Sequence, residues 1–335
     1  MMKKSMKIVL YTSLALTAFS TSAMSQERRL FYDQISMVEE PLATQIGDTT
    51  FSLRGSVEVP VKTLSTTKKA EIGFRGAFEI KAETQLENSL KIAASYAAEY
   101  DYLNDDQFTY KVVLSASGFL GSIYVGNVSD MLRENLARTS GVGNSDLAYD
   151  GNWGQLGRWS VAHFSRHGPY RAGLAVDQNG KFELGFVFQR PVKTLEHKYA
   201  LRLTSGEFNP SGSNIDLDTI TAQGVAEIIY GSSLFSLGGG IEHIKGPISH
   251  ANRWFVAGGA QTKIGVVSLS ADAQYGQLKG QDTLSTALGA RYDFARGASV
   301  NLGVNYKKAD VLLDGLLLRK DDNVVEGIVS IRYDF

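Results

Sequence analysis

The chain has 335 residues, a formal net charge of −1 and no cysteine. The lack of cysteine excludes a disulfide framework, a thiolate nucleophile and a metal site built on thiolates. Glycine is abundant (34 residues) and proline scarce (6), a composition that suits many twisted strands joined by tight turns. We expect no nucleic-acid partner for this near-neutral chain.

The first elements in the chain are those of a secretory signal peptide. The first seven residues carry three lysines, an apolar run follows over 8–19, and small residues occupy most of 21–25. This order predicts a signal peptide over 1–25, and therefore export. The apolar run is too short for a stable membrane span, and no later stretch reaches the roughly 18–20 apolar residues of a transmembrane helix.

Residues 26–49 are mostly polar and lack a strand pattern that continues into the next segment. We expect them to form a periplasmic N-terminal leader, to which the sequence assigns no function. The β-structure is predicted to fill 50–335. It comprises about sixteen segments of period two: 50–59, 69–82, 89–102, 108–117, 119–126, 157–166, 169–177, 181–190, 196–205, 218–230, 233–245, 252–263, 265–277, 283–294, 297–308 and 323–335.

These segments have one apolar and one polar face. In 283–294, for example, Leu284, Leu288 and Tyr292 alternate with Ser285 and Arg291. A soluble β-sandwich would show the same alternation. Most segments, however, run 9–14 residues, longer than the roughly 5–6 of globular strands and near the 9–11 of a tilted membrane strand.

The connections favour the membrane alternative. Tight turns such as Gly231-Ser232, Lys263-Ile264 and Ala295-Arg296-Gly297 alternate with longer connections such as 206–217 and 309–322. Short turns at one rim and long loops at the other are typical of outer-membrane barrels. We therefore predict an all-β fold, a transmembrane antiparallel β-barrel of about 16 strands, in the cell outer membrane and in contact with its lipid. Interior side chains cannot fill a barrel of this size, so the lumen should hold water.

The longest connection, 127–156, follows the fifth predicted strand and is too apolar for a solvated tether. Together with the signal peptide, the strand number and the terminal Phe335, it resembles the general trimeric porins of Gram-negative bacteria, most of all the alphaproteobacterial type. The resemblance covers nearly the whole exported chain, although the Pro-Glu-Phe-Gly-type tip of many such loops is absent.

The resemblance implies a homotrimer in which 127–156 folds into the lumen as a constriction loop. Its acidic residues would face basic side chains on the opposite wall. Carried over by position, Asp130, Glu134, Asp146 and Asp150 form the acidic side.

The basic side follows from strand parity. Five basic residues fall on the lumen face of strands that become adjacent when the barrel closes: Arg54, Arg75, Lys91, Lys111 and Arg332. On the lipid face an arginine would cost about 2–4 kcal/mol at the midplane. The functional interpretation is a transverse field that orients dipolar solutes. The alternative is an ordinary polar lumen, in which Glu58, Glu71 and Glu79 partly neutralise the arginines.

No sequence motif indicates an enzyme, a cofactor or a metal site. A G-x-S-x-G motif is absent, and His163 and His167 fall in a strand and a turn, where a spacing of four does not bring them together. We expect a passive channel for small hydrophilic solutes and ions. The alternatives are a substrate-selective channel for sugars or anions, and a structural or adhesive barrel.

The last segment, from Val325 to Phe335, alternates up to its final residue. We expect it to close the barrel by pairing with 50–59. In the family that the chain resembles, the terminal aromatic also acts as an assembly signal for the barrel-assembly machinery, and Phe335 would take that role.

Overall fold

The structure is a computed structural model. It describes residues 41–66, 69–86, 89–103, 107–128, 136, 138–139, 141–145, 147, 156, 159–192, 195–208, 217–246, 250–278, 281–308, 313–314, 317–318 and 323–335. The predicted signal peptide and residues 26–40 of the predicted leader lie outside these ranges. No helix in the described part of the chain has the length and hydropathy needed to cross a membrane.

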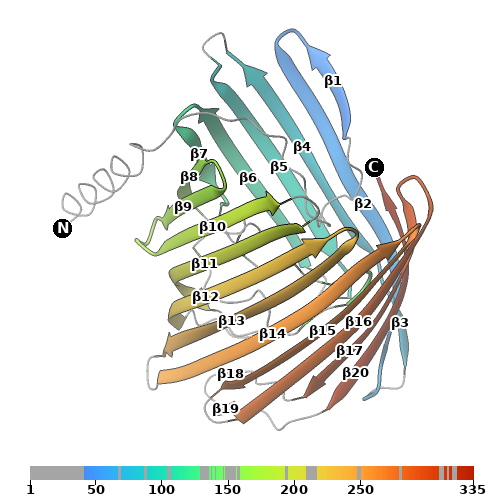
Figure 1. The fold of residues 1–335 in the computed structure, drawn as a ribbon. Helices are drawn as coiled ribbons and strands as arrows, with labels where there is room; N and C mark the ends of the chain where they lie inside the picture. Colours follow the sequence, from blue (N-terminus) through green and yellow to red (C-terminus); the bar gives the residue numbers. More distant parts are fainter. Residues whose placement is uncertain are drawn as a thin grey trace.

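Within the described residues, sixteen antiparallel strands close into one ring (Figure 1). In order round the ring they are β2 (Thr49–Leu64), β4 (Arg75–Gln85), β5 (Lys91–Asp101), β6 (Gln107–Gly118), β7 (Gly121–Gly126), β8 (Ser160–His167), β9 (Tyr170–Asp177), β10 (Phe182–Val192), β11 (Leu195–Phe208), β12 (Leu217–Tyr230), β13 (Ser233–Lys245), β14 (His250–Ile264), β15 (Val267–Leu278), β16 (Gln281–Ala295), β17 (Ala298–Lys308) and β20 (Val324–Asp334). The predicted β-barrel is confirmed.

The described part of the chain has four shorter strands outside this ring order. They are β1 (Leu42–Ile46), β3 (Ala70–Ile72), β18 (Leu313–Asp314) and β19 (Leu317–Leu318). β3 pairs with β2 just before β4 begins, and β18 pairs with β19 alone.

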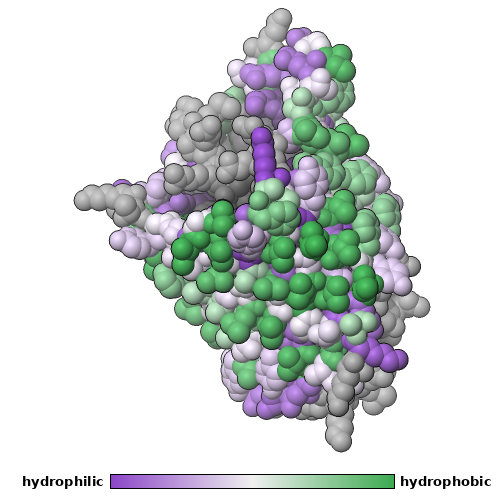
Figure 2. All heavy atoms as spheres, turned by 90° about the vertical axis from the view of Figure 1, so that its right-hand side faces the viewer, coloured by the Kyte–Doolittle hydropathy of each residue, from purple (hydrophilic) through white to green (hydrophobic). Residues whose placement is uncertain are grey.

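The two faces of the strands differ as their period predicts. On β16, Leu288 and Tyr292 point outward and are exposed, whereas Ser285 and Arg291 point inward and are buried. Figure 2 shows the outcome on one side of the molecule: hydrophobic side chains gather in a broad band, with hydrophilic ones towards its two ends. An apolar outer face around a polar interior matches a barrel that has lipid outside and water within.

Tight turns lie at one end of the barrel, which we call the short-turn end. Gly168, Gly231, Gly265 and Gly297 stand in these turns with φ between 55° and 75°, the left-handed conformation that two-residue hairpin turns require and glycine adopts without strain. The turn predicted at Lys263-Ile264 is therefore displaced to Gly265. We call the opposite end the long-loop end.

The ring closes between the last strand and the first, as predicted. β20 pairs with β2 from Ser56↔Asp334 to Leu64↔Glu326. Beyond that ladder, Gly55 and Phe335 exchange two backbone hydrogen bonds of 2.8 and 2.9 Å. The closed ring leaves neither strand with an unpaired edge over this length, as a sheet in contact with hydrocarbon requires.

The predicted boundary of the leader at residue 49 is wrong. Leu42–Ile46 form β1, which pairs with β2 from Leu42↔Leu53 to Ile46↔Thr49. The reason is the length of β2, which extends past the end of β20 towards the short-turn end and would otherwise offer an unpaired edge. Gly47, with φ of 61°, supplies the turn between the two strands.

Candidate functional site: pore lining and inner loop

Cross-strand ion pairs line the inner wall. Six of them join inward-facing side chains of neighbouring strands: Arg54–Glu79, Arg75–Asp101, Lys91–Glu83, Lys198–Glu227, Arg202–Glu183 and Arg253–Glu242. A further pair crosses one strand, because Arg291 on β16 lies 3.6 Å from Asp334 on β20, with β17 between them. Pairing offsets the cost of holding charge against the wall. It also means that most charges of the lumen face a counter-charge within the same sheet.

The structure brings the five predicted basic residues together on neighbouring strands. They point inward from β2, β4, β5, β6 and β20, which are consecutive in the ring: Arg54, Arg75, Lys91, Lys111 and Arg332. Strand parity therefore predicted their position correctly. Their role in a constriction stays a prediction.

Ion pairs neutralise much of this positive charge. Arg54 pairs with Glu79, Arg75 donates from Nε to Asp101 at 2.9 Å, and Arg332 donates to Asp334 at 2.8 Å. Lys91 lies 3.4 Å from Glu83, which also binds Lys81 at 2.5 Å. The neutralising partners named from sequence were thus correct for Glu79. Asp101 and Glu83 were missed because the register between β4 and β5 was unknown, and Asp334 was missed although it lies only two residues from Arg332 on the same face of β20.

The connection between β7 and β8, residues 127–159, is here called the inner loop, and its described residues from Leu136 to Ser145 contact the inner wall. Arg138 donates to Asp272 on β15 at 2.6 Å and to Ser236 on β13 at 2.9 Å. The side chains of Arg138 and Asp272 are each only 1% exposed. A fully buried pair of this kind fixes the loop at one point of the wall.

A second anchor lies further round the ring. The backbone N–H of Val142 donates to the hydroxyl of Ser270 on β15 at 2.9 Å, and the side-chain amide of Asn144 donates to the hydroxyl of Ser330 on β20 at 2.9 Å. The side-chain amide of Asn305 on β17 donates a hydrogen bond of 3.1 Å to the backbone carbonyl of Asn144. Together with the Arg138 anchor, these contacts fasten the loop to the wall from β13 to β20.

Inward-facing glycines make room for the loop. A Cβ at Gly289 would overlap the carbonyl of Val142, one at Gly303 that of Asn144, and one at Gly185 the side chain of Leu136. Glycine at such wall positions lets a second backbone approach closely. Each of the three lies on a different strand, so no single segment of the sequence indicates that these glycines together accommodate the loop. The predicted acidic residues of this loop (Asp130, Glu134, Asp146 and Asp150) lie outside the described residues.

This packing predicts the effect of one added methyl group. We expect Gly303→Ala to push the carbonyl of Asn144 off the wall and to lower the free energy of unfolding by about 1–3 kcal/mol, the usual cost of overpacking. Urea unfolding of the folded protein in detergent measures the change. Gly258→Ala is the matched control, because its Cβ would meet nothing closer than 3.5 Å; equal losses in both variants would contradict the seating of the loop.

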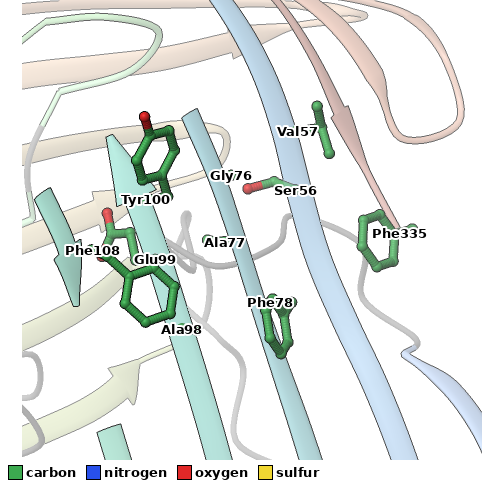
Figure 3. A pocket seen from close by; sticks show the side chains of 10 residues that line it. All are labelled: Ser56, Val57, Gly76, Ala77, Phe78, Ala98, Glu99, Tyr100, Phe108 and Phe335. Carbon is green, nitrogen blue, oxygen red and sulfur yellow. The ribbon is translucent and has the colours of Figure 1, made fainter. Parts of the chain in front are cut away.

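The outer face carries a hollow beside the barrel seam (Figure 3). It has a volume of about 240 Å³, is almost wholly apolar, and is lined by residues that include Gly76, Ala98, Tyr100 and Phe335. The ring of Phe335 covers Gly55, where a Cβ would lie 2.6 Å from its Cζ. Small residues on an outward face leave room there for a lipid chain or another protein surface.

The histidines singled out from sequence do not come together. His163 and His167 are both on β8, four residues apart along an extended strand, which separates them by about 13 Å. His163 instead lies 3.3 Å from the carbonyl of Leu120. Among the residues that the structure describes, no group of three or more His, Asp or Glu side chains could hold a metal ion.

No protein-family model and no curated protein sequence matches this chain. Solved structures do match. The anion-selective porin from Comamonas acidovorans superposes with a TM-score of 0.63 at 15% identity, over 86% of this chain and 100% of that one. OmpT in its trimer form, an outer membrane protein of Vibrio cholerae, gives 0.66 at 15% identity, over 86% and 99%.

A mutant of the Rh. blastica porin gives a TM-score of 0.53 at 14% identity, over 85% of this chain and 100% of that one. At these identities the likeness is one of fold. It nevertheless extends over the full length of each matched barrel. The chain therefore has the fold of a porin: a closed sixteen-stranded antiparallel transmembrane β-barrel.

Proposed function

We propose that the protein is an outer-membrane porin, a water-filled channel through which small hydrophilic solutes and ions diffuse passively, and that it is not an enzyme. The observation that carries the proposal is the closed ring of sixteen strands with an apolar outer and a polar, ion-paired inner face. A ring of this size is too wide for its own side chains to fill. The gradient of the solute itself would drive transport.

The exposure of the inner wall indicates where the path runs. On β10 and β12, the inward carboxylates Glu183 and Glu227 are 0% exposed. On β4 and β5, across the ring, Lys81, Glu83 and Lys91 are 42%, 31% and 36% exposed. We place the path along β2 to β6, between that wall and the inner loop, which is anchored on the far side.

We propose a constriction between the inner loop and this wall. Asp130, Glu134, Asp146 and Asp150 would form its acidic side, and Arg54, Arg75, Lys91, Lys111 and Arg332 its basic side. Support comes from the anchoring of the loop by Arg138 and Asn144 and from the clustering of the basic residues on adjacent strands. Because the basic residues are largely ion-paired, we expect a moderate transverse field.

Ion selectivity tests the charge assignment. Replacing both Arg54 and Arg75 by Gln leaves Glu79 and Asp101 without these partners in the lumen, so we expect the reversal potential in a salt gradient to move towards cations. Asp130→Asn with Glu134→Gln should move it towards anions. Lys245→Gln with Lys308→Gln is the control, because both lysines are exposed on outward positions. Unchanged potentials in both lumen variants would refute the constriction.

A second candidate is a channel selective for anions. Two lysines, Lys81 and Lys91, flank the single carboxylate of Glu83 near the short-turn end, which leaves a local excess of one positive charge. One structural neighbour is named as an anion-selective porin. Liposome swelling separates the two functions: similar entry rates for neutral sugars and small anions of equal size support the general channel, whereas strong preference for anions supports the selective one.

We further propose a homotrimer, assembled in the outer membrane by the barrel-assembly machinery with Phe335 as its signal. The apolar hollow at Gly76 and Ala98 offers a surface for a second copy, and a neighbour of the same fold is described in trimer form. Sedimentation of the detergent-solubilised protein tests the trimer; a monomer at every concentration would contradict it.

A further inference from the structure

Two histidines stand together at the long-loop end of the barrel, on the outer face of β13 and β14, which are neighbours in Figure 1. The register pairs His243 with Asn252, and Lys245 with His250. His243 and His250 are therefore diagonal neighbours across the two strands. Both are exposed and point away from the lumen, so the proposed permeation path does not use them.

The separation of the two rings suits a shared metal ion. Their centroids are 5.6 Å apart and their planes meet at 24°. With metal–nitrogen bonds near 2.1 Å, each ring centroid lies about 3.2 Å from the metal, and a tetrahedral angle then places the centroids about 5.2 Å apart. The observed separation exceeds this by a few tenths of an ångström, which small rotations of two exposed side chains can supply.

A third residue fixes the tautomer of His243. Its Nδ1 lies 2.6 Å from the side-chain oxygen of Asn252. Because an amide oxygen only accepts hydrogen bonds, the Nδ1–H of His243 donates to it, and in the neutral ring Nε2 then carries the lone pair. A histidine that donates from one ring nitrogen while presenting the other is the arrangement found around bound metals.

We propose that His243 and His250 form a two-histidine site for a transition-metal ion that prefers imidazole, such as Zn²⁺, Ni²⁺ or Cu²⁺, with water in the remaining positions. Imidazole nitrogens favour these ions over Mg²⁺ and Ca²⁺, which take oxygen ligands. The site lies on the outer rim and is independent of the proposed channel function.

The charges around the site set its strength. Lys245 is the cross-strand partner of His250 and opposes a second cation there. Asp218, the partner of Lys245 on β12, is ion-paired with Lys181. We therefore expect Lys245→Gln to tighten metal binding several-fold, and Asn252→Asp to do so as well, because a carboxylate raises the basicity of the histidine to which it is bonded.

Calorimetric titration of the folded full-length protein in detergent with Zn²⁺ and with Ni²⁺ tests the proposal. We expect one ion per chain, at least a tenfold loss of affinity in His243→Gln and in His250→Gln, and tighter binding in Lys245→Gln. His163→Gln with His167→Gln is the control, since it also removes two histidines from strands near a rim, and it should bind as the parent does.

The spectrum of bound Cu²⁺ provides a readout that does not depend on stability. Two equivalent nitrogen ligands in the paramagnetic resonance spectrum, reduced to one in either single variant, support the site. The proposal is overturned if the parent binds no ion, if the control loses as much affinity as the site variants, or if Lys245→Gln leaves the affinity unchanged.

Discussion

Replacing Asp272 by alanine should detach the inner loop from the wall. The carboxylate accepts a hydrogen bond of 2.6 Å from Arg138, and both side chains are 1% exposed. Removing one partner of such a buried ion pair leaves the other charge uncompensated and costs about 3–5 kcal/mol. The loss falls on the contact between loop and wall, so we expect a lower free energy of unfolding in urea and larger fluctuations of the open-channel current.

Two further variants identify the cause. Ser236→Ala removes the hydrogen bond that Arg138 donates to Ser236, together with a long 3.5 Å bond from Ser236 to the carbonyl of Gly259, and should cost about 1 kcal/mol. Arg138→Met combined with Asp272→Leu replaces the pair by apolar groups of similar volume, a change that often leaves the free energy of unfolding unaltered. This double variant should restore the small current fluctuations of the parent. If Asp272→Ala has the same free energy of unfolding and the same open-channel current as the parent, the loop is not held by this pair.

An arginine on the outer face of β6 should impair insertion. Leu114 points outward near the middle of that strand and is 56% exposed. Arg at such a position costs about 2–4 kcal/mol near the bilayer midplane. Refolding of Leu114→Arg into phospholipid vesicles, followed by the change in electrophoretic mobility on folding, should show a clearly reduced folded fraction at intermediate urea.

The adjacent residue supplies the control. Ser115 points inward on the same strand, so Ser115→Arg introduces the same charge into the lumen and should fold nearly as the parent does. Equal impairment by both substitutions would contradict the assignment of faces on which the membrane barrel rests.

The barrel was predictable because its physical cause is local. Period two, strand length and glycine turns are properties of short segments, and they located all sixteen strands of the ring. The inward orientation of Arg54 and Arg332 followed from the alternation of polar and apolar faces along each strand. β1 escaped prediction because Leu42–Ile46 has five residues and pairs only to cover the overhang of β2, which depends on where β20 ends.

The site was less predictable because its contacts are long-range. Asn144 and Ser330 are separated by 186 residues, and no local pattern encodes that pairing. Taken singly, Gly289 and Gly303 are glycines inside strands, where glycine is ordinarily destabilising. In the structure they are cross-strand partners that make room for the loop. His243 and His250 likewise needed the register of β13 and β14.

Single-channel recording in planar lipid bilayers tests the central claim most directly. The purified protein, with its folded state verified by electrophoretic mobility, should insert in discrete steps, each with a large conductance that is linear in voltage and not saturated by sugars. Folded protein that inserts into the bilayer without any step in conductance would contradict the account of this barrel as a water-filled channel.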